Sequence, residues 1–236
     1  MLTDAKAGTL VKTSLVDFPT RVSAVMFFVG CNLRCPYCYN HAVVHGDIPQ
    51  EELLSLADLE AFFQKRHKVL SGFVASGGEA LLSPLLPRAL EMAKDFGLAT
   101  KLDTNGTLPE KLISLFENDE TRPDYLAVDV KTSPKRYDSL LGQGYGEKIL
   151  ATLDFLKALD VDSYEIRTVL VPTMVDSREI TEIGESVSKD ANWFLAQFRA
   201  ENCLNPQFND LIPYDEAKLQ SLADLAKTKV PNARLR

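Results

Sequence analysis

The sequence predicts an α/β fold in which six parallel strands alternate with helices. The first observation behind this prediction is the near-continuous apolar run at residues 23–29, which is typical of a strand buried on both faces of a sheet. The second is that similar short runs recur along the chain. The third is that segments with apolar residues at helical spacing separate these runs. Such an alternation implies a parallel sheet with right-handed crossovers.

The expected elements follow one another in a regular order. Strands are expected at residues 23–29, 72–76, 98–103, 125–130, 166–171 and 193–198. Helices are expected near 59–66, at 84–96, from 109, around 149–156, at 176–187 and at 215–227. Gly97 suits the end of the second helix, and Pro109 suits the first turn of the third. Asp176 and Glu179 form a capping-box-like start to the fifth.

Composition and length favour one soluble domain. We expect a single domain over residues 1–236, with an N-terminal segment at 1–21, a core at about 22–200 and a C-terminal helix within about 211–236. The net charge of −7 argues against a nucleic-acid partner. No signal-peptide pattern opens the chain, and the apolar run at 22–29 is far shorter than the ~20 residues that span a bilayer. A cytoplasmic protein without a membrane partner is therefore expected.

Three of the four cysteines lie in one loop directly after the first expected strand, at Cys31, Cys35 and Cys38. Thiolates are the usual ligands of [4Fe–4S] clusters, which ordinarily take four. Three local ligands would leave one iron open to exogenous chemistry. Cys203 is the other candidate ligand, far along the chain. The alternative is a closed zinc site made by the same three cysteines with His41.

Other chemically unusual residues follow the next three expected strands. In order, they are Gly77, Gly78 and Glu79, then Asp103 and Thr104, then Asp129 and Lys131. Because function in parallel α/β folds gathers at the carboxyl ends of strands, we expect these residues to contribute to one site. Arg167, on the fifth strand, is suited to binding a carboxylate.

The cysteine loop at residues 30–40 resembles the cluster loop of the radical S-adenosylmethionine superfamily, with the same spacing and an aromatic residue before the third cysteine. By this resemblance Cys31, Cys35 and Cys38 hold a [4Fe–4S] cluster, and Tyr37 lies against the adenine of the cofactor. Residues 76–79 are similar to the second motif of the superfamily, whose backbone and glutamate meet the methionine amino group. Glycine there is expected to let the ligand lie flush against the strand end. The resemblance implies a partial (βα)6 barrel.

Residues 102–106 and 127–131 resemble stretches of glycyl-radical-enzyme activating enzymes such as the pyruvate formate-lyase activase. The resemblance places Asp103, Thr104 and Asp129 around the cofactor carboxylate with a monovalent cation, and brings Lys131 to the cofactor. Arg199 stands where that activase carries a cofactor-contacting histidine. Residues 12–19 and 197–199 resemble the branch that activates anaerobic ribonucleotide reductase.

The expected function is reductive cleavage of S-adenosylmethionine to a 5′-deoxyadenosyl radical that installs a glycyl radical in a partner enzyme. The partner would be of the anaerobic ribonucleotide reductase or pyruvate formate-lyase type, and a flavodoxin-like or ferredoxin-like protein would donate the electron. Two alternatives stay open. One is a radical enzyme that acts on a small molecule or peptide, and the other is a zinc-stabilised binding module without catalysis.

Overall fold

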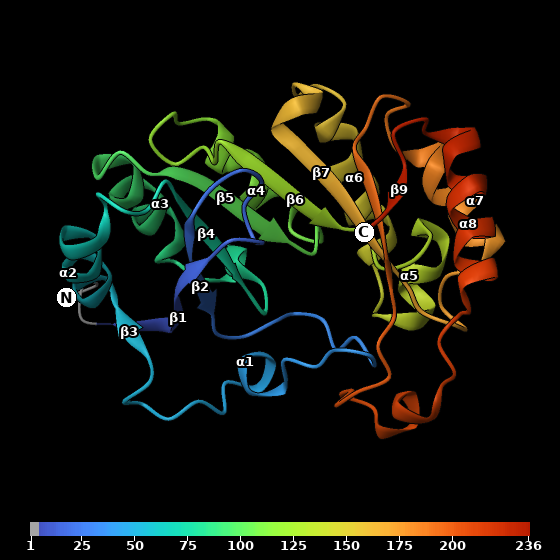
Figure 1. Ribbon diagram of the computed structural model, residues 1–236, viewed down its shortest axis with the longest axis horizontal. Helices are drawn as coiled ribbons and strands as arrows, with labels where there is room; N and C mark the ends of the chain where they lie inside the picture. The colour runs from blue at the N-terminus through green and yellow to red at the C-terminus, as the bar shows by residue number, and fades with distance from the viewer. Residues whose placement is uncertain (1–4) are drawn as a thin grey trace. The chain divides into compact units, whose positions relative to one another are not determined.

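The computed structural model describes residues 5–236 and has an α/β architecture with mostly parallel strands (Figure 1). The first four residues of the expected N-terminal segment 1–21 lie outside the described part. The chain divides into two units. The first holds the described residues up to Asn32, together with Asn40–Thr104 and Glu110–Leu126; the second holds Leu33–Tyr39, Asn105–Pro109 and Ala127–Arg236. Over residues 5–236, every helix is too short or too polar to cross a bilayer.

Five strands of the first unit lie in the order β3 (Leu54–Ser55), β1 (Lys6–Ser14), β2 (Ser23–Phe28), β4 (Gly72–Gly77) and β5 (Ala99–Thr104). β1 is antiparallel to both of its neighbours, whereas β2, β4 and β5 are parallel. Phe28 at the end of β2 stands opposite Gly77 at the end of β4. The loops after these two strands therefore start at the same edge.

The helices of the first unit are α1 (His41–His45), α2 (Leu56–Arg66), the 3-10 turn η1 (Ala80–Leu82), α3 (Leu86–Asp95) and α4 (Pro109–Phe116). Helix α2 begins at a capping box in which the Ser55 hydroxyl accepts from the Asp58 amide and the Asp58 carboxylate accepts from the Ser55 amide. Its buried face includes Phe63, whose ring meets that of Phe73 on β4 edge to face at 5.3 Å. This contact fixes α2 on the sheet.

β6 (Tyr125–Asp129) contributes its first two residues to the first unit and its last three to the second. The other strands of the second unit are β7 (Tyr164–Leu170), β8 (Trp193–Gln197) and β9 (Arg234–Leu235), all parallel. Its helices are α5 (Pro134–Leu140), α6 (Tyr145–Leu156), α7 (Ser177–Ser186) and α8 (Glu216–Lys229), with 3-10 turns η2 (Val161–Ser163) and η3 (Pro206–Asp210).

Helices α7 and α8 lie side by side in the second unit (Figure 1). Helix α7 begins at the expected capping box of Asp176 and Glu179. A Cβ at Gly184 would lie 2.6 Å from the Lys229 side chain, so only glycine allows this close approach of the two helices. Beneath them Trp193 is fully buried and donates its indole N–H to the Thr168 hydroxyl at 3.0 Å.

All six expected strands are confirmed, as β2, β4, β5, β6, β7 and β8. Three strands were not expected. β3 and β9 have two residues each, and β1 lies in the segment expected only as an N-terminal extension. Helices α1 and α5 were also not expected. The extra strands flank the predicted set without interrupting it, so the carboxyl ends of the parallel strands remain where the candidate site residues lie.

Candidate cofactor site

In the first unit, the Gly-Gly-Glu motif is bonded to the backbone that leads into the cysteine loop. The Gly78 amide donates to the Phe28 carbonyl at 3.0 Å, and the Glu79 amide donates to the Gly30 carbonyl at 2.9 Å. The carboxyl end of β4 and the residues that precede Cys31 therefore form one hydrogen-bonded layer.

The two glycines are required by this layer. Gly77 has φ +132, and a Cβ there would lie 2.3 Å from the Phe28 oxygen. A Cβ at Gly78 would lie 2.1 Å from the Gly30 oxygen and 3.0 Å from the Cys31 Cβ. Since backbone atoms fill this space, the glycines permit the approach of two protein segments. The sequence analysis expected glycine here to make room for a ligand, whereas in the structure it makes room for neighbouring backbone.

Glu79 is buried, with an exposed fraction of 1%. Its Oε1 accepts from the Thr104 hydroxyl at 2.9 Å and from the Leu81 amide at 3.1 Å, which also caps η1. Two of the predicted site residues, Glu79 and Thr104, are thus brought into direct contact. The carboxylate is held in one position at the ends of β4 and β5.

Asp103 forms an ion pair that sequence reasoning missed. Lys101 is almost fully buried, and its Nζ lies 3.0 Å from Asp103 Oδ1. The same ammonium donates to the Asp17 carbonyl at 2.6 Å. A lysine in the interior of a predicted strand was the available signal. Asp103 therefore has a cationic partner within the chain. The monovalent cation expected near Asp103 from the sequence stays a prediction.

In the second unit, Asp129 at the end of β6, Lys131 just after it and Arg167 in the middle of β7 form a charged trio. Asp129 accepts from Lys131 Nζ at 2.9 Å through Oδ2 and from Arg167 Nε at 2.7 Å through Oδ1. Burial raises the pKa of Asp129, but the charges of Arg167 and Lys131 outweigh it and hold this pKa well below its usual range. Burial likewise lowers the pKa of Lys131, and Asp129 more than offsets it. The trio is fully ionised near neutral pH and carries one net positive charge.

Tyr37 lies among these charges in the second unit. Burial raises the pKa of its phenol, and the charges that act on it include those of Lys131, Cys35 and Asp129. Its ring meets that of Phe198 edge to face at 6.4 Å. Among the described residues its buried hydroxyl finds no hydrogen-bond partner. A buried phenol without a partner is costly, and this points to a group that the chain itself does not supply.

The cysteine loop is fastened by a later segment of the second unit. The Leu204 amide donates to the Cys38 carbonyl, and the Asn205 amide donates to the Pro36 carbonyl, both at 2.8 Å. Cys35 is buried, whereas Cys31 and Cys38 are partly exposed. Over residues 5–236, no three His, Cys, Asp or Glu side chains are gathered closely enough to bind a single metal ion.

Two further predicted residues lie after β8. Cys203 is buried, and its amide donates to Asn209 Oδ1 at 2.8 Å. Burial raises the pKa of its thiol. Arg199 is exposed, and within the described part of the chain it makes no ion pair with Asp129. The structure thus brings together Glu79 with Thr104, and Asp129 with Lys131 and Arg167.

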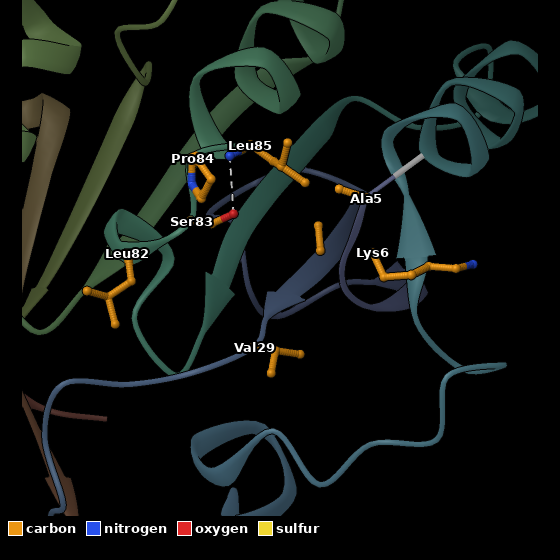
Figure 2. A pocket seen from close by; sticks show the side chains of 8 residues that line it. Ala5, Lys6, Val29, Leu82, Ser83, Pro84 and Leu85 are labelled. Atoms are coloured by element: carbon orange, nitrogen blue, oxygen red, sulfur yellow. Dashed lines mark hydrogen bonds between the residues drawn. The ribbon is translucent and has the colours of Figure 1, made fainter. Parts of the chain in front are cut away.

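A cavity of about 370 Å³ lies elsewhere in the first unit (Figure 2). Apolar side chains such as Val29 and Leu85 line it, together with Lys6 and Ser83. It includes none of the site residues predicted from the sequence.

The chain belongs to the radical SAM superfamily, whose family model matches residues 25–183. The cofactors of this superfamily are a [4Fe–4S] cluster and S-adenosylmethionine, and the chain is an enzyme of this type. The zinc-stabilised module without catalysis is therefore wrong as a description of this chain.

Individual proteins of this superfamily are similar to the chain over most of its length. The chain is 31% identical over 236 residues to a protein of Methanocaldococcus jannaschii assigned by name to the glycyl-radical enzyme activating enzymes, with 96% of this chain and 94% of the relative covered. It is 32% identical over 209 residues to the pyruvate formate-lyase-activating enzyme of Clostridium pasteurianum, covering 85% and 78%. QueE from Escherichia coli superposes with a TM-score of 0.56 at 14% identity, covering 98% and 92%, which shows a shared fold.

Proposed function

We propose that this enzyme installs a glycyl radical in a partner protein. The observation that carries the proposal is the similarity, over nearly the full length of both chains, to a protein named as an activating enzyme of glycyl-radical enzymes. A pyruvate formate-lyase-activating enzyme matches at comparable identity. The partner is thus a glycyl-radical enzyme, of the anaerobic ribonucleotide reductase or pyruvate formate-lyase type.

The residues present fit the two cofactors. The unpartnered, buried hydroxyl of Tyr37 leaves room for an interaction that a bound ligand supplies. The net positive charge of the Asp129–Lys131–Arg167 trio suits the carboxylate of an amino-acid cofactor. We assign the cluster to the thiolates of Cys31, Cys35 and Cys38, the ligand type that [4Fe–4S] clusters require.

When bound, the two cofactors supply a 5′-deoxyadenosyl radical by one-electron cleavage of the sulfonium C5′–S bond, which also releases methionine. The protein binds and orients the two cofactors, and it excludes water from them. Lys131 and Arg167 hold the cofactor carboxylate, and Tyr37 packs against the adenine. The backbone of Gly77 and Gly78 with the carboxylate of Glu79 receives the cofactor amino group. Glu79 is preset for this by Thr104 and the Leu81 amide.

The hydrogen atom that is removed comes from a glycine Cα of the partner, and it leaves in 5′-deoxyadenosine. The electron comes from a flavodoxin-like or ferredoxin-like donor. The net charge of −7 is consistent with protein partners and with the absence of a nucleic-acid partner. A cytoplasmic location is part of this proposal.

The test is electron paramagnetic resonance on anaerobically reconstituted protein. About four iron and four sulfide per chain, with a broad absorption band at ~400 nm, are expected after reconstitution. Reduced protein mixed with S-adenosylmethionine and candidate glycyl-radical enzymes should give a glycyl doublet on one partner and release 5′-deoxyadenosine. The matched control replaces the radical-bearing glycine of the partner by alanine and should remove the doublet. Release of 5′-deoxyadenosine without a doublet on any partner would favour a small-molecule or peptide substrate.

A further inference from the structure

A fully buried carboxylate lies next to the charged trio. Glu165 is on β7, two residues before Arg167 and on the same face of the strand, and its side chain has an exposed fraction of 0%. A buried carboxylate is costly unless cations compensate it. Arg236 provides one such cation, with its NH1 atom 3.3 Å from each Glu165 oxygen. Arg167 provides another, with its NH1 atom 3.8 Å from Oε1.

Arg236 is itself held in two ways. Its amide donates to the Leu195 carbonyl on β8 at 2.9 Å, directly after β9. Its guanidinium lies 4.5 Å from the centre of the Phe194 ring, and so does that of Arg234. Within the described residues, Arg234 makes no ion pair with Glu165. The two arginines therefore share the aromatic contact and differ in the carboxylate contact.

Five charged groups now stand in series, from Arg236 through Glu165, Arg167 and Asp129 to Lys131. Three are cations and two are anions, so the series carries a net charge of +1. Removing the Arg236 side chain takes one positive charge away from the surroundings of Glu165 and Arg167.

We propose that Arg236 is a positioning residue for cofactor binding, an inference that rests on the proposed function. By neutralising Glu165, it leaves Arg167 bonded to Asp129 and leaves one positive charge for the carboxylate of S-adenosylmethionine. Glu165 holds the Arg167 guanidinium in place, and Arg236 offsets the charge of Glu165 so that Arg167 is not drawn away from Asp129.

The test measures the Kd of S-adenosylmethionine for cluster-loaded protein by equilibrium dialysis. Arg236→Ala should raise the Kd about tenfold, which corresponds to ~1.4 kcal/mol. Arg236→Lys should keep most of the affinity because it retains the charge. Arg234→Ala is the matched control and should bind as the wild type does, since it removes only the shared contact with Phe194.

The double variant Glu165→Gln with Arg236→Ala separates charge from packing. It restores the net charge of +1, so its Kd should return to within about twofold of the wild-type value. A role of Arg236 in packing β9 alone predicts that the double variant binds as weakly as Arg236→Ala, and that result would overturn the inference. Wild-type affinity in Arg236→Ala would do the same. A wild-type protein that binds no S-adenosylmethionine would instead overturn the proposed function, and this inference with it.

Discussion

Asp129 lies between two cations, at 2.9 Å from Lys131 and 2.7 Å from Arg167. Its pKa is lower in the folded protein than the ~3.9 of an unfolded chain, so its ionised form stabilises the fold above that pH and this contribution is lost as the pH falls. Asp129→Asn should therefore lower the free energy of unfolding by about 1–3 kcal/mol between pH 6 and pH 8. The difference should shrink below about pH 4.

Urea unfolding of both proteins from pH 3 to pH 8 measures this. Asp154→Asn is the control, because Asp154 near the end of α6 forms an exposed ion pair with Lys157, the residue after the helix. It should change stability by less than about 0.5 kcal/mol at every pH. A pH-independent loss in Asp129→Asn would contradict the assigned ionisation.

Thr104 supplies a hydrogen bond to a carboxylate that is almost fully buried. Thr104→Val keeps the shape of the side chain and removes the hydroxyl that donates to Glu79 Oε1 at 2.9 Å. We expect a loss of about 1–3 kcal/mol in the free energy of unfolding, because a buried charged acceptor loses a partner. Thr104→Ser retains the donor and should lose less. Chemical denaturation of the cluster-free protein gives both values; equal losses would show that the methyl group, and not the hydroxyl, matters.

Some site contacts follow from the sequence, and others do not. Asp129 and Lys131 are two residues apart at a strand end, so their shared face is visible from the two-residue period of a strand. Arg236 and Glu165 are 71 residues apart, and nothing local in the sequence pairs them. Lys101 is a charged residue in the interior of a predicted strand, but only the fold brings the Asp17 carbonyl to it. Local sequence patterns identify candidate site residues, but the fold determines which residues they contact.

At the scale of elements, β2 was predictable because its sequence is a nearly continuous apolar run. β1 was missed for the opposite reason. It is antiparallel to both of its neighbours, and exposed residues occupy much of its length, so its sequence resembles an extended surface segment. β9 has only two residues, and no periodicity can be read from so short a strand. The guanidinium groups of Arg234 within it and of Arg236 after it both lie over the Phe194 ring.

The segment at 202–205 restrains the cysteine loop through its backbone. Leu204→Pro removes the amide that donates to the Cys38 carbonyl at 2.8 Å, and proline has no replacement donor. We expect reconstituted protein to lose iron faster than the wild type does on gel filtration. Leu204→Ala keeps the amide and is the control. Equal iron retention in both variants would show that the loop holds its shape without this bond.

At the scale of the whole molecule, the alternation of strands and helices was predictable, but the division into two units was not. The predicted site residues fall into both units, with Cys31 in the first and Cys35 and Cys38 in the second. The division depends on which distant segments pack together, and neither composition nor a linker marks it in the sequence.

Binding of the cluster should stabilise the entire chain, because a ligand that binds only the folded state raises its stability. We expect the Tm of anaerobically loaded protein to exceed that of cluster-free protein by several degrees, roughly 2–4 °C for each kcal/mol gained. Cys35→Ala should remove the increase and the iron. Cys203→Ala should keep both, since we assign no cluster bond to that buried thiol; a loss of iron in this variant would make Cys203 a ligand. Differential scanning calorimetry with iron analysis distinguishes these results.

The close approach of Gly78 to the Gly30 carbonyl bears on how this protein can be recombined with its relatives. A larger residue at position 78 forces residue 30 to move, and Cys31 is the next residue along the chain. In a chimaera, segments 23–31 and 72–79 must therefore come from the same parent protein. A chimaera whose crossover falls between them joins backbones that did not evolve to fit, whereas one that exchanges both together keeps the match.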